Sequence, residues 1–139
     1  DDRWYPYSEF CGLLEKTRQV VKETRTPTLF KLGHDALYGD VRWLPMFKGK
    51  DPKDVFGTNN RQDAMFIVGR FEMVSVENGL VSVKMTLWSK EGKDNAIWAQ
   101  YYHGMLQGIM DTTGRTGQVR MEEKSEGDER KWFFRITWQ

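Results

Sequence analysis

The stretch from Asn95 to Gly114 constrains the fold more than any other part of this sequence. Asp94 or Asn95 can cap the start of a helix there, and Gly114 can end it in the left-handed conformation. Its apolar residues recur at intervals of three and four, which places them on one broad stripe. They are Ile97, Trp98, Tyr101, Tyr102, Met105, Leu106, Ile109 and Met110. The pattern predicts one long amphipathic helix around which the rest of the chain is arranged.

Alternating apolar residues predict a pair of strands on each side of this helix. Asn78-Gly79 joins the first pair, and Asn-Gly is the strongest two-residue hairpin signal because a type I′ turn needs positive φ at both central positions. On the last strand, Trp132, Phe134, Ile136 and Trp138 face one way. The expected strands are residues 71–76, 81–87, 119–121 and 131–138.

Gly104 and Gly108 lie four residues apart inside the predicted helix. Each costs about 1 kcal/mol relative to alanine in a helix interior, so we expect a structural gain that offsets this cost. Close approach of another backbone is such a gain. Because the helix joins two hairpins and must lie across their sheet, we expect the two glycines to face that sheet.

Helical spacing and capping residues predict three helices before the sheet. Between the second and the third, Leu44-Pro45 and Gly49 break any regular element across residues 41–50. Trp43 and Phe47 make this connector too apolar for a solvated loop, so we expect it to fold onto the body. The expected helices are residues 8–23, 26–39 and 51–68, the last with an interruption.

The whole chain reads as one α+β domain, residues 1–139. We expect N-terminal helices followed by ββ-α-ββ, with a four-stranded antiparallel sheet under a helical layer. A hydrophobic content of 39% with 14% aromatic residues excludes disorder. Lys and Arg number 21 against 20 Asp and Glu, so no long-range field attracts a polyanion and we expect no nucleic-acid partner.

The inventory of reactive side chains is small. Cys11 is the one cysteine, which excludes an intrachain disulfide and a cysteine-cluster zinc site. The two histidines, His34 and His103, lack the neighbouring ligands of a metal site. The sequence contains no nucleophile elbow, phosphate loop or dinucleotide fingerprint. We therefore expect neither an enzyme nor a bound metal or cofactor.

Hydropathy favours a protein that does not span a membrane. No apolar run approaches eighteen residues and no signal peptide opens the chain, so a cytoplasmic location is expected. Lys48, Lys50 and Lys53 form a small basic cluster around the connector, which is weakly indicative of an acidic partner.

Several segments together resemble a known family. They are Trp4-Tyr5-Pro6 leading into a helix, Leu32-Gly33, residues 69–76 leading to Asn78-Gly79, and Gly104-Met105-Leu106-Gln107-Gly108 followed by a valine-containing strand pair. This combination looks like a bacterial, myxobacterial-type family of uncharacterised domains akin to the 4-vinyl-reductase and haem-NO-binding domains. The resemblance spans nearly the whole chain and implies an α+β sensor or interaction fold.

The chain departs from these relatives in two respects. Relatives of the 4-vinyl-reductase type often carry a cysteine-rich metal site, which one cysteine cannot form, so that metal is not carried over. Haem-NO-binding domains hold iron through a histidine and carry a Tyr-x-Ser-x-Arg motif, which is absent here. A haem or tetrapyrrole sensor with His103 as axial ligand is therefore only a minor alternative.

Large aromatic side chains carry the best functional signal, because they lie on both faces of their elements and exceed what one small core holds. The first hypothesis is a non-catalytic regulatory module that binds a small apolar or aromatic ligand in a pocket between helices and sheet. The second is a protein-interaction or homodimerisation module without a ligand. The expected ligand-binding or interface residues are Trp88, Trp98, Tyr101, Tyr102 and His103.

Overall fold

The computed structural model describes residues 28–57, 69–87, 92–124 and 130–139, together with Glu9, Gly12, Leu13, Glu15, Lys16 and Gln19. These six separate residues are helical, in agreement with the first predicted helix, most of which lies outside the described residues. The predicted third helix beyond Gly57 and the candidate site residue Trp88 also lie outside them.

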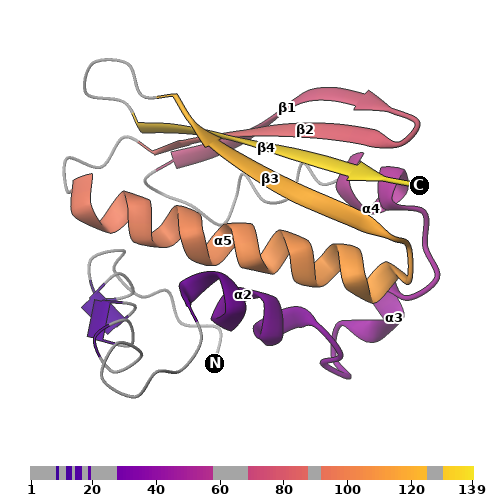
Figure 1. Ribbon diagram of the computed structural model, residues 1–139, viewed down its shortest axis with the longest axis horizontal. Helices are drawn as coiled ribbons and strands as arrows, with labels where there is room; N and C mark the ends of the chain where they lie inside the picture. The colour runs from indigo at the N-terminus through magenta and orange to yellow at the C-terminus, as the bar shows by residue number, and fades with distance from the viewer. Residues whose placement is uncertain are drawn as a thin grey trace.

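The described elements form three layers (Figure 1): an antiparallel sheet, helix α5 on one of its faces, and helix α2 on the side of α5 away from the sheet. The sheet has four strands in the order β1-β2-β4-β3. This architecture confirms the expected α+β class and its ββ-α-ββ order. The elements are α2 (Leu29–Leu37), α3 (Leu44–Phe47), α4 (Pro52–Gly57), β1 (Gly69–Glu77), β2 (Leu80–Leu87), α5 (Gly92–Thr113), β3 (Gly117–Glu123) and β4 (Arg130–Trp138).

The helices before the sheet begin at capping residues. The Thr28 hydroxyl accepts a hydrogen bond from the Lys31 backbone N–H at 3.3 Å, so Thr28 is the N-cap of α2. At the start of α4, the Asp51 carboxylate accepts from the Lys53 N–H at 2.9 Å. Pro52 occupies the first position of α4, where a missing N–H costs nothing.

The connector between α2 and α4 is partly helical, contrary to expectation. Pro45 was expected to break regular structure, but it lies in the first turn of α3, where proline is tolerated. The expectation that the connector folds onto the body is confirmed. The Gly49 N–H donates to the carbonyl of Thr113 at 3.1 Å, and Phe47 packs against the core.

The β1–β2 hairpin contains the expected two-residue turn and one unexpected bulge. Glu77 pairs with Leu80 around Asn78-Gly79, and Gly79 has φ of 83°. The register shifts between Met73 and Ser75. Because directly paired residues share a face, the bulge at Val74 brings Val76, opposite Val81, to the same face as Met73, opposite Val83. Without the bulge, strict alternation along the strand would place Met73 and Val76 on opposite faces.

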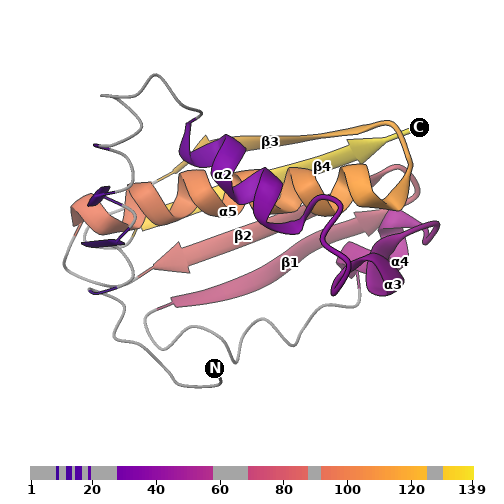
Figure 2. The same cartoon turned by 90° about the horizontal axis from the view of Figure 1, so that it is seen from below.

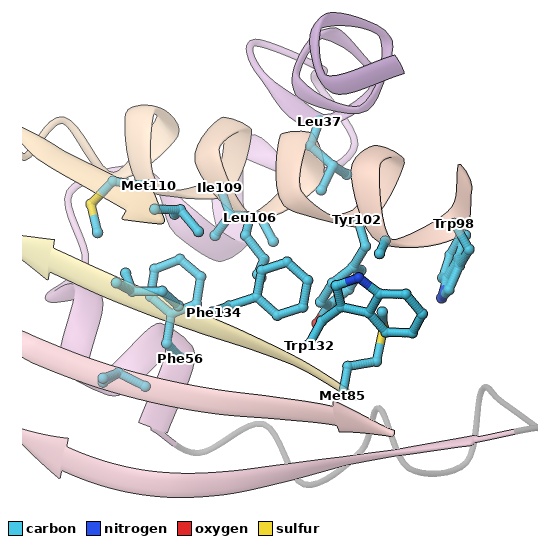
Figure 3. Packing of buried hydrophobic residues seen from close by; sticks show 14 of the residues in the cluster. Leu37, Phe56, Met85, Trp98, Tyr102, Leu106, Ile109, Met110, Trp132 and Phe134 are labelled. Carbon is cyan, nitrogen blue, oxygen red and sulfur yellow. The ribbon is translucent and has the colours of Figure 1, made fainter. Parts of the chain in front are cut away.

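The main core lies between α5 and the sheet (Figure 3), where side chains from the two layers point toward one another. The predicted common face of Trp132, Phe134 and Ile136 on β4 is confirmed, since these residues are buried, and Trp138 packs against them partly buried. Side chains with 2% exposure or less fill this layer: Val81, Met85, Leu106, Met110, Trp132, Phe134 and Ile136.

Gly104 and Gly108 face α2, not the sheet, so the expected partner was wrong. A Cβ atom at Gly104 would overlap the carbonyl of Phe30 and lie 2.9 Å from the backbone nitrogen of His34. At Gly108 it would lie 2.5 Å from the His34 carbonyl oxygen, and Gly33 of α2 faces the Tyr101 carbonyl in the same way. Close approach of another backbone was correctly expected. The glycines lie on the side of α5 that packs against α2, and Figure 2 shows α2 crossing α5.

Candidate functional site

The aromatic residues predicted on α5 form one cluster that continues into β4. The ring centroids of Trp98 lie 6.0 Å from those of both Tyr101 and Tyr102, and Tyr102 meets Phe134 edge to face at 5.3 Å. We refer to Trp98, Tyr101, Tyr102 and Phe134 as the aromatic cluster. Figure 3 labels its members Trp98, Tyr102 and Phe134, whose side chains lie in the core between α5 and the sheet.

The members of the aromatic cluster differ in exposure. Trp98 and Tyr102 are 6% and 4% exposed and belong to the core, whereas Tyr101 is half-buried. Burial raises the pKa of the Tyr101 phenol, so this ring stays neutral at physiological pH. The contacts of Trp98 and Tyr102 within the described structure are core contacts, and their role toward a ligand or partner stays a prediction.

His103 lies beside the aromatic cluster and fastens α5 to the sheet. Its Nε2 donates to the carbonyl of Val119 on β3 at 2.7 Å, which fixes the tautomer because a carbonyl only accepts. The ring meets Phe30 of α2 edge to face, with centroids 4.7 Å apart. Burial lowers the pKa of His103, and the hydrogen bond to Val119 opposes part of this shift.

Gln107 was not singled out from the sequence, yet it bonds the same strand. Its Oε1 accepts the Val119 N–H at 2.9 Å, and its Nε2 donates to the Gly117 carbonyl at 3.2 Å. Together with His103, it satisfies backbone groups on the open side of β3, an edge strand that would otherwise present them to another chain. The interval of four between His103, Gln107 and Asp111, which places them on one side of a helix, is the signal that could have indicated them.

His34 connects α2 to the same row of side chains. Its Nε2 lies 2.7 Å from Asp111 Oδ2, and its Nδ1 lies 3.0 Å from Asp35 Oδ1. Asp111 also accepts from Gln107 at 2.9 Å. A continuous series of hydrogen bonds therefore joins α2, α5 and β3. The partners His34 and Asp111 are 77 positions apart, so no local pattern could reveal them.

We expect His103→Gln to reduce the dependence of stability on pH. Burial lowers the pKa of His103 from 6.5, so the unfolded chain binds the proton more readily and protonation opposes folding. The stabilisation by the neutral ring is complete above the unfolded pKa and is lost as the pH falls below it. Wild type should therefore lose more unfolding free energy than His103→Gln between about pH 7 and about pH 5. Urea titrations measure this, and equal losses would contradict it.

The ring nitrogens of the two histidines that form hydrogen bonds in the described structure bond to carbonyl or carboxylate oxygens. Neither His34 nor His103 is hydrogen-bonded to a hydroxyl or thiol, within the described part of the chain. Over the same residues, no three or more His, Cys, Asp or Glu side chains gather in a way that could hold a metal ion. Hydrogen bonds between side chains and to the backbone connect α2, α5 and the sheet beside the aromatic cluster.

Comparison with known proteins establishes the type of fold. No protein-family model matches the chain, and no curated protein matches it. Among solved structures, a Cs H-NOX mutant containing 4-cyano-L-phenylalanine is 13% identical with a TM-score of 0.68, and the match covers 99% of this chain and 75% of that one. A point mutant of T. tengcongensis H-NOX is 12% identical with a TM-score of 0.67, covering 99% and 76%.

A third solved structure is the oxygen complex of an oxygen-binding H-NOX domain related to soluble guanylate cyclases, at 12% identity, a TM-score of 0.67, and coverage of 99% of this chain and 74% of that one. At this identity the likeness shows the fold alone. The resemblance to haem-NO-binding sensor domains is thus confirmed at the level of the fold, whereas the myxobacterial and 4-vinyl-reductase relationships stay predictions. The chain has the fold of the H-NOX sensor domains.

Proposed function

We propose that this chain is a non-catalytic sensor module that binds a small apolar or aromatic ligand beside the aromatic cluster. The likeness to H-NOX domains supports a sensor role. The observation that carries the ligand proposal is that Trp98 stacks on Tyr101 and lies tilted against Tyr102, with ring centroids 6.0 Å apart in each pair. Such rings bind flat or apolar molecules through their faces.

The packing of the core narrows the position of the ligand. Toward the end of α5, Leu106 and Met110 fill the layer against Phe134 and Ile136, all at 2% exposure or less. In the aromatic cluster, Tyr101 stays half-buried. A ligand that stacks on Tyr101 and extends toward Trp98 would therefore contact aromatic surface without displacing the packed centre.

Haem is a candidate ligand because solved structures with this fold concern haem and bound oxygen. Haem iron in a protein needs an axial side-chain ligand such as a histidine nitrogen. In the described residues, His103 Nε2 is bonded to the Val119 carbonyl, and both ring nitrogens of His34 lie within 3.0 Å of carboxylate oxygens. Both ring nitrogens of His34 and Nε2 of His103 therefore already have protein partners, so a histidine-ligated tetrapyrrole remains the less favoured alternative.

We expect native mass spectrometry of protein purified from its own source to show a small organic ligand. Tyr101→Ala should lower the ligand-bound fraction several-fold because it removes an aromatic face. Tyr38→Ala is the matched control, since Tyr38 is 52% exposed and lies outside the aromatic cluster. Absorbance spectra of the same samples test the alternative, because a Soret band would assign haem. Purified protein without any ligand mass would contradict the proposal.

Association through α5 is the second candidate, as a homodimer or with a protein partner. Because Trp98 and Tyr102 are buried, such an interface would have to use the half-buried Tyr101 and His103. Sedimentation velocity at protein concentrations on the order of tens of micromolar distinguishes this candidate, since it requires an assembly that a charge at position 101 disrupts.

A further inference from the structure

The exposed apolar side chains of the described structure are concentrated in one short segment. Of those large hydrophobic residues that face solvent, four lie within positions 38–46, with Val41 at 78%, Tyr38 and Met46 at 52% and Trp43 at 37% exposure. Such a concentration on a folded domain marks a contact surface more often than chance exposure. With the exposed lysines that follow, we define the connector surface as Tyr38, Val41, Trp43, Met46, Lys48 and Lys50.

The connector surface is held in place by its own backbone. Gly49 donates to the Thr113 carbonyl of α5 at 3.1 Å, and Phe47 packs on the core while stacking with Trp43 at a centroid distance of 6.5 Å. Figures 1 and 2 both place α3 and α4 together at one end of the molecule. The exposed side chains are therefore presented on a fixed turn and a short helix.

The connector surface carries positive charge that the acidic residues within the connector do not neutralise. Arg42 donates to both Asp40 oxygens and holds the pKa of that carboxyl down to about 2, so these two charges neutralise each other. Asp51 caps α4. Lys48 and Lys50 are exposed and form no ion pair with any described residue. Within the described structure, two exposed and unpaired ammonium groups thus follow the exposed aromatic and aliphatic side chains in the sequence.

We propose that the connector surface docks on an anionic lipid bilayer. Aromatic and aliphatic side chains enter the headgroup region while neighbouring lysines pair with anionic headgroups. A two-fold contact between copies would bring one positively charged surface against the same surface of the other copy, which disfavours self-association here. The contact is peripheral, because no helix among the described residues is long and apolar enough to cross a membrane.

Co-sedimentation of the full chain with vesicles tests this proposal. We expect binding to vesicles of phosphatidylcholine with phosphatidylserine at low salt, weaker binding as salt rises, and little binding to phosphatidylcholine alone. The double variant Lys48→Glu with Lys50→Glu should bind at least about tenfold more weakly, since each lysine near an anionic surface contributes about 1 kcal/mol. The double variant Val41→Ser with Met46→Ser should also lose binding, which a purely electrostatic contact would not show.

Two controls keep the result specific. Lys124→Glu makes the same change at a lysine whose side chain is 58% exposed, after β3 at the opposite end of the sheet, and should bind as wild type does. Val74→Ser removes an apolar side chain that is 56% exposed on β1 and should likewise have no effect. Circular dichroism checks that each variant is folded. Absence of wild-type binding, or equal loss in Lys124→Glu, overturns the proposal, and a protein contact mapped to this surface without vesicle binding would assign it to a protein partner.

Discussion

Replacing Gly104 with alanine should destabilise the protein by about 1–3 kcal/mol, although the same change in an open helix stabilises it by about 1 kcal/mol. The added Cβ would overlap the Phe30 carbonyl and lie 2.7 Å from its carbonyl carbon. These are backbone atoms of α2, so no side-chain rotation relieves the overlap and α2 must shift off α5. Urea titration of the purified chain measures the change in unfolding free energy.

Gly12→Ala is the matched control for this prediction. Gly12 is helical and exposed, and a Cβ there would meet nothing within 4 Å. It should therefore show the gain of helix propensity without a clash. Gly108→Leu should also lower the unfolding free energy. Its Cβ atom alone would lie 2.5 Å from the carbonyl oxygen of His34. If Gly104→Ala stabilised the chain as much as Gly12→Ala, the close helix crossing would be wrong.

Tyr102→Asp should unfold the protein, with a loss on the order of 4–5 kcal/mol or more. Tyr102 is 4% exposed and packs on Phe134 and Trp98, so the variant would place a carboxylate among aromatic rings. Transfer of a charge to such surroundings is among the most costly substitutions, because the group loses its hydration without gaining a partner. Circular dichroism and urea titration measure this loss.

Tyr38→Asp provides the comparison for Tyr102→Asp. Tyr38 is 52% exposed, so its replacement should change the unfolding free energy by only about 0.5 kcal/mol. The pair also decides between two roles for Tyr102. A folded Tyr102→Asp protein whose oligomeric state had changed would favour an interface role and would contradict the core position described here.

The sequence predicted which residues of the candidate site lie together, but it did not predict which of them are buried. Trp98, Tyr101, Tyr102 and His103 do lie together, because residues three and four apart on a helix are neighbours. Large aromatic side chains were taken as surplus to the core, but Trp98 and Tyr102 are buried within it. The amino-acid composition gives the number of aromatic side chains but not the volume available to them between α5 and the sheet. In the structure, Tyr102 packs against Phe134 of β4.

The sequence by itself determined the elements whose signals are local. The long helix α5, the Asn78-Gly79 hairpin and the inward face of β4 follow from periodicity and turn chemistry, which act between residues close in the chain. The requirement for close backbone approach at Gly104 and Gly108 was also local, since the cost of glycine in a helix is an intrinsic property.

Only the tertiary structure decided which surfaces meet. The glycines of α5 pack against α2 because the opposite side of α5 carries large side chains that pack on the sheet. The strand order β1-β2-β4-β3, the bulge at Val74 and the bond between His34 and Asp111 join residues distant in sequence. Such contacts depend on how whole layers fit together, and a pattern read along a single segment contains no information about the segment that it will face.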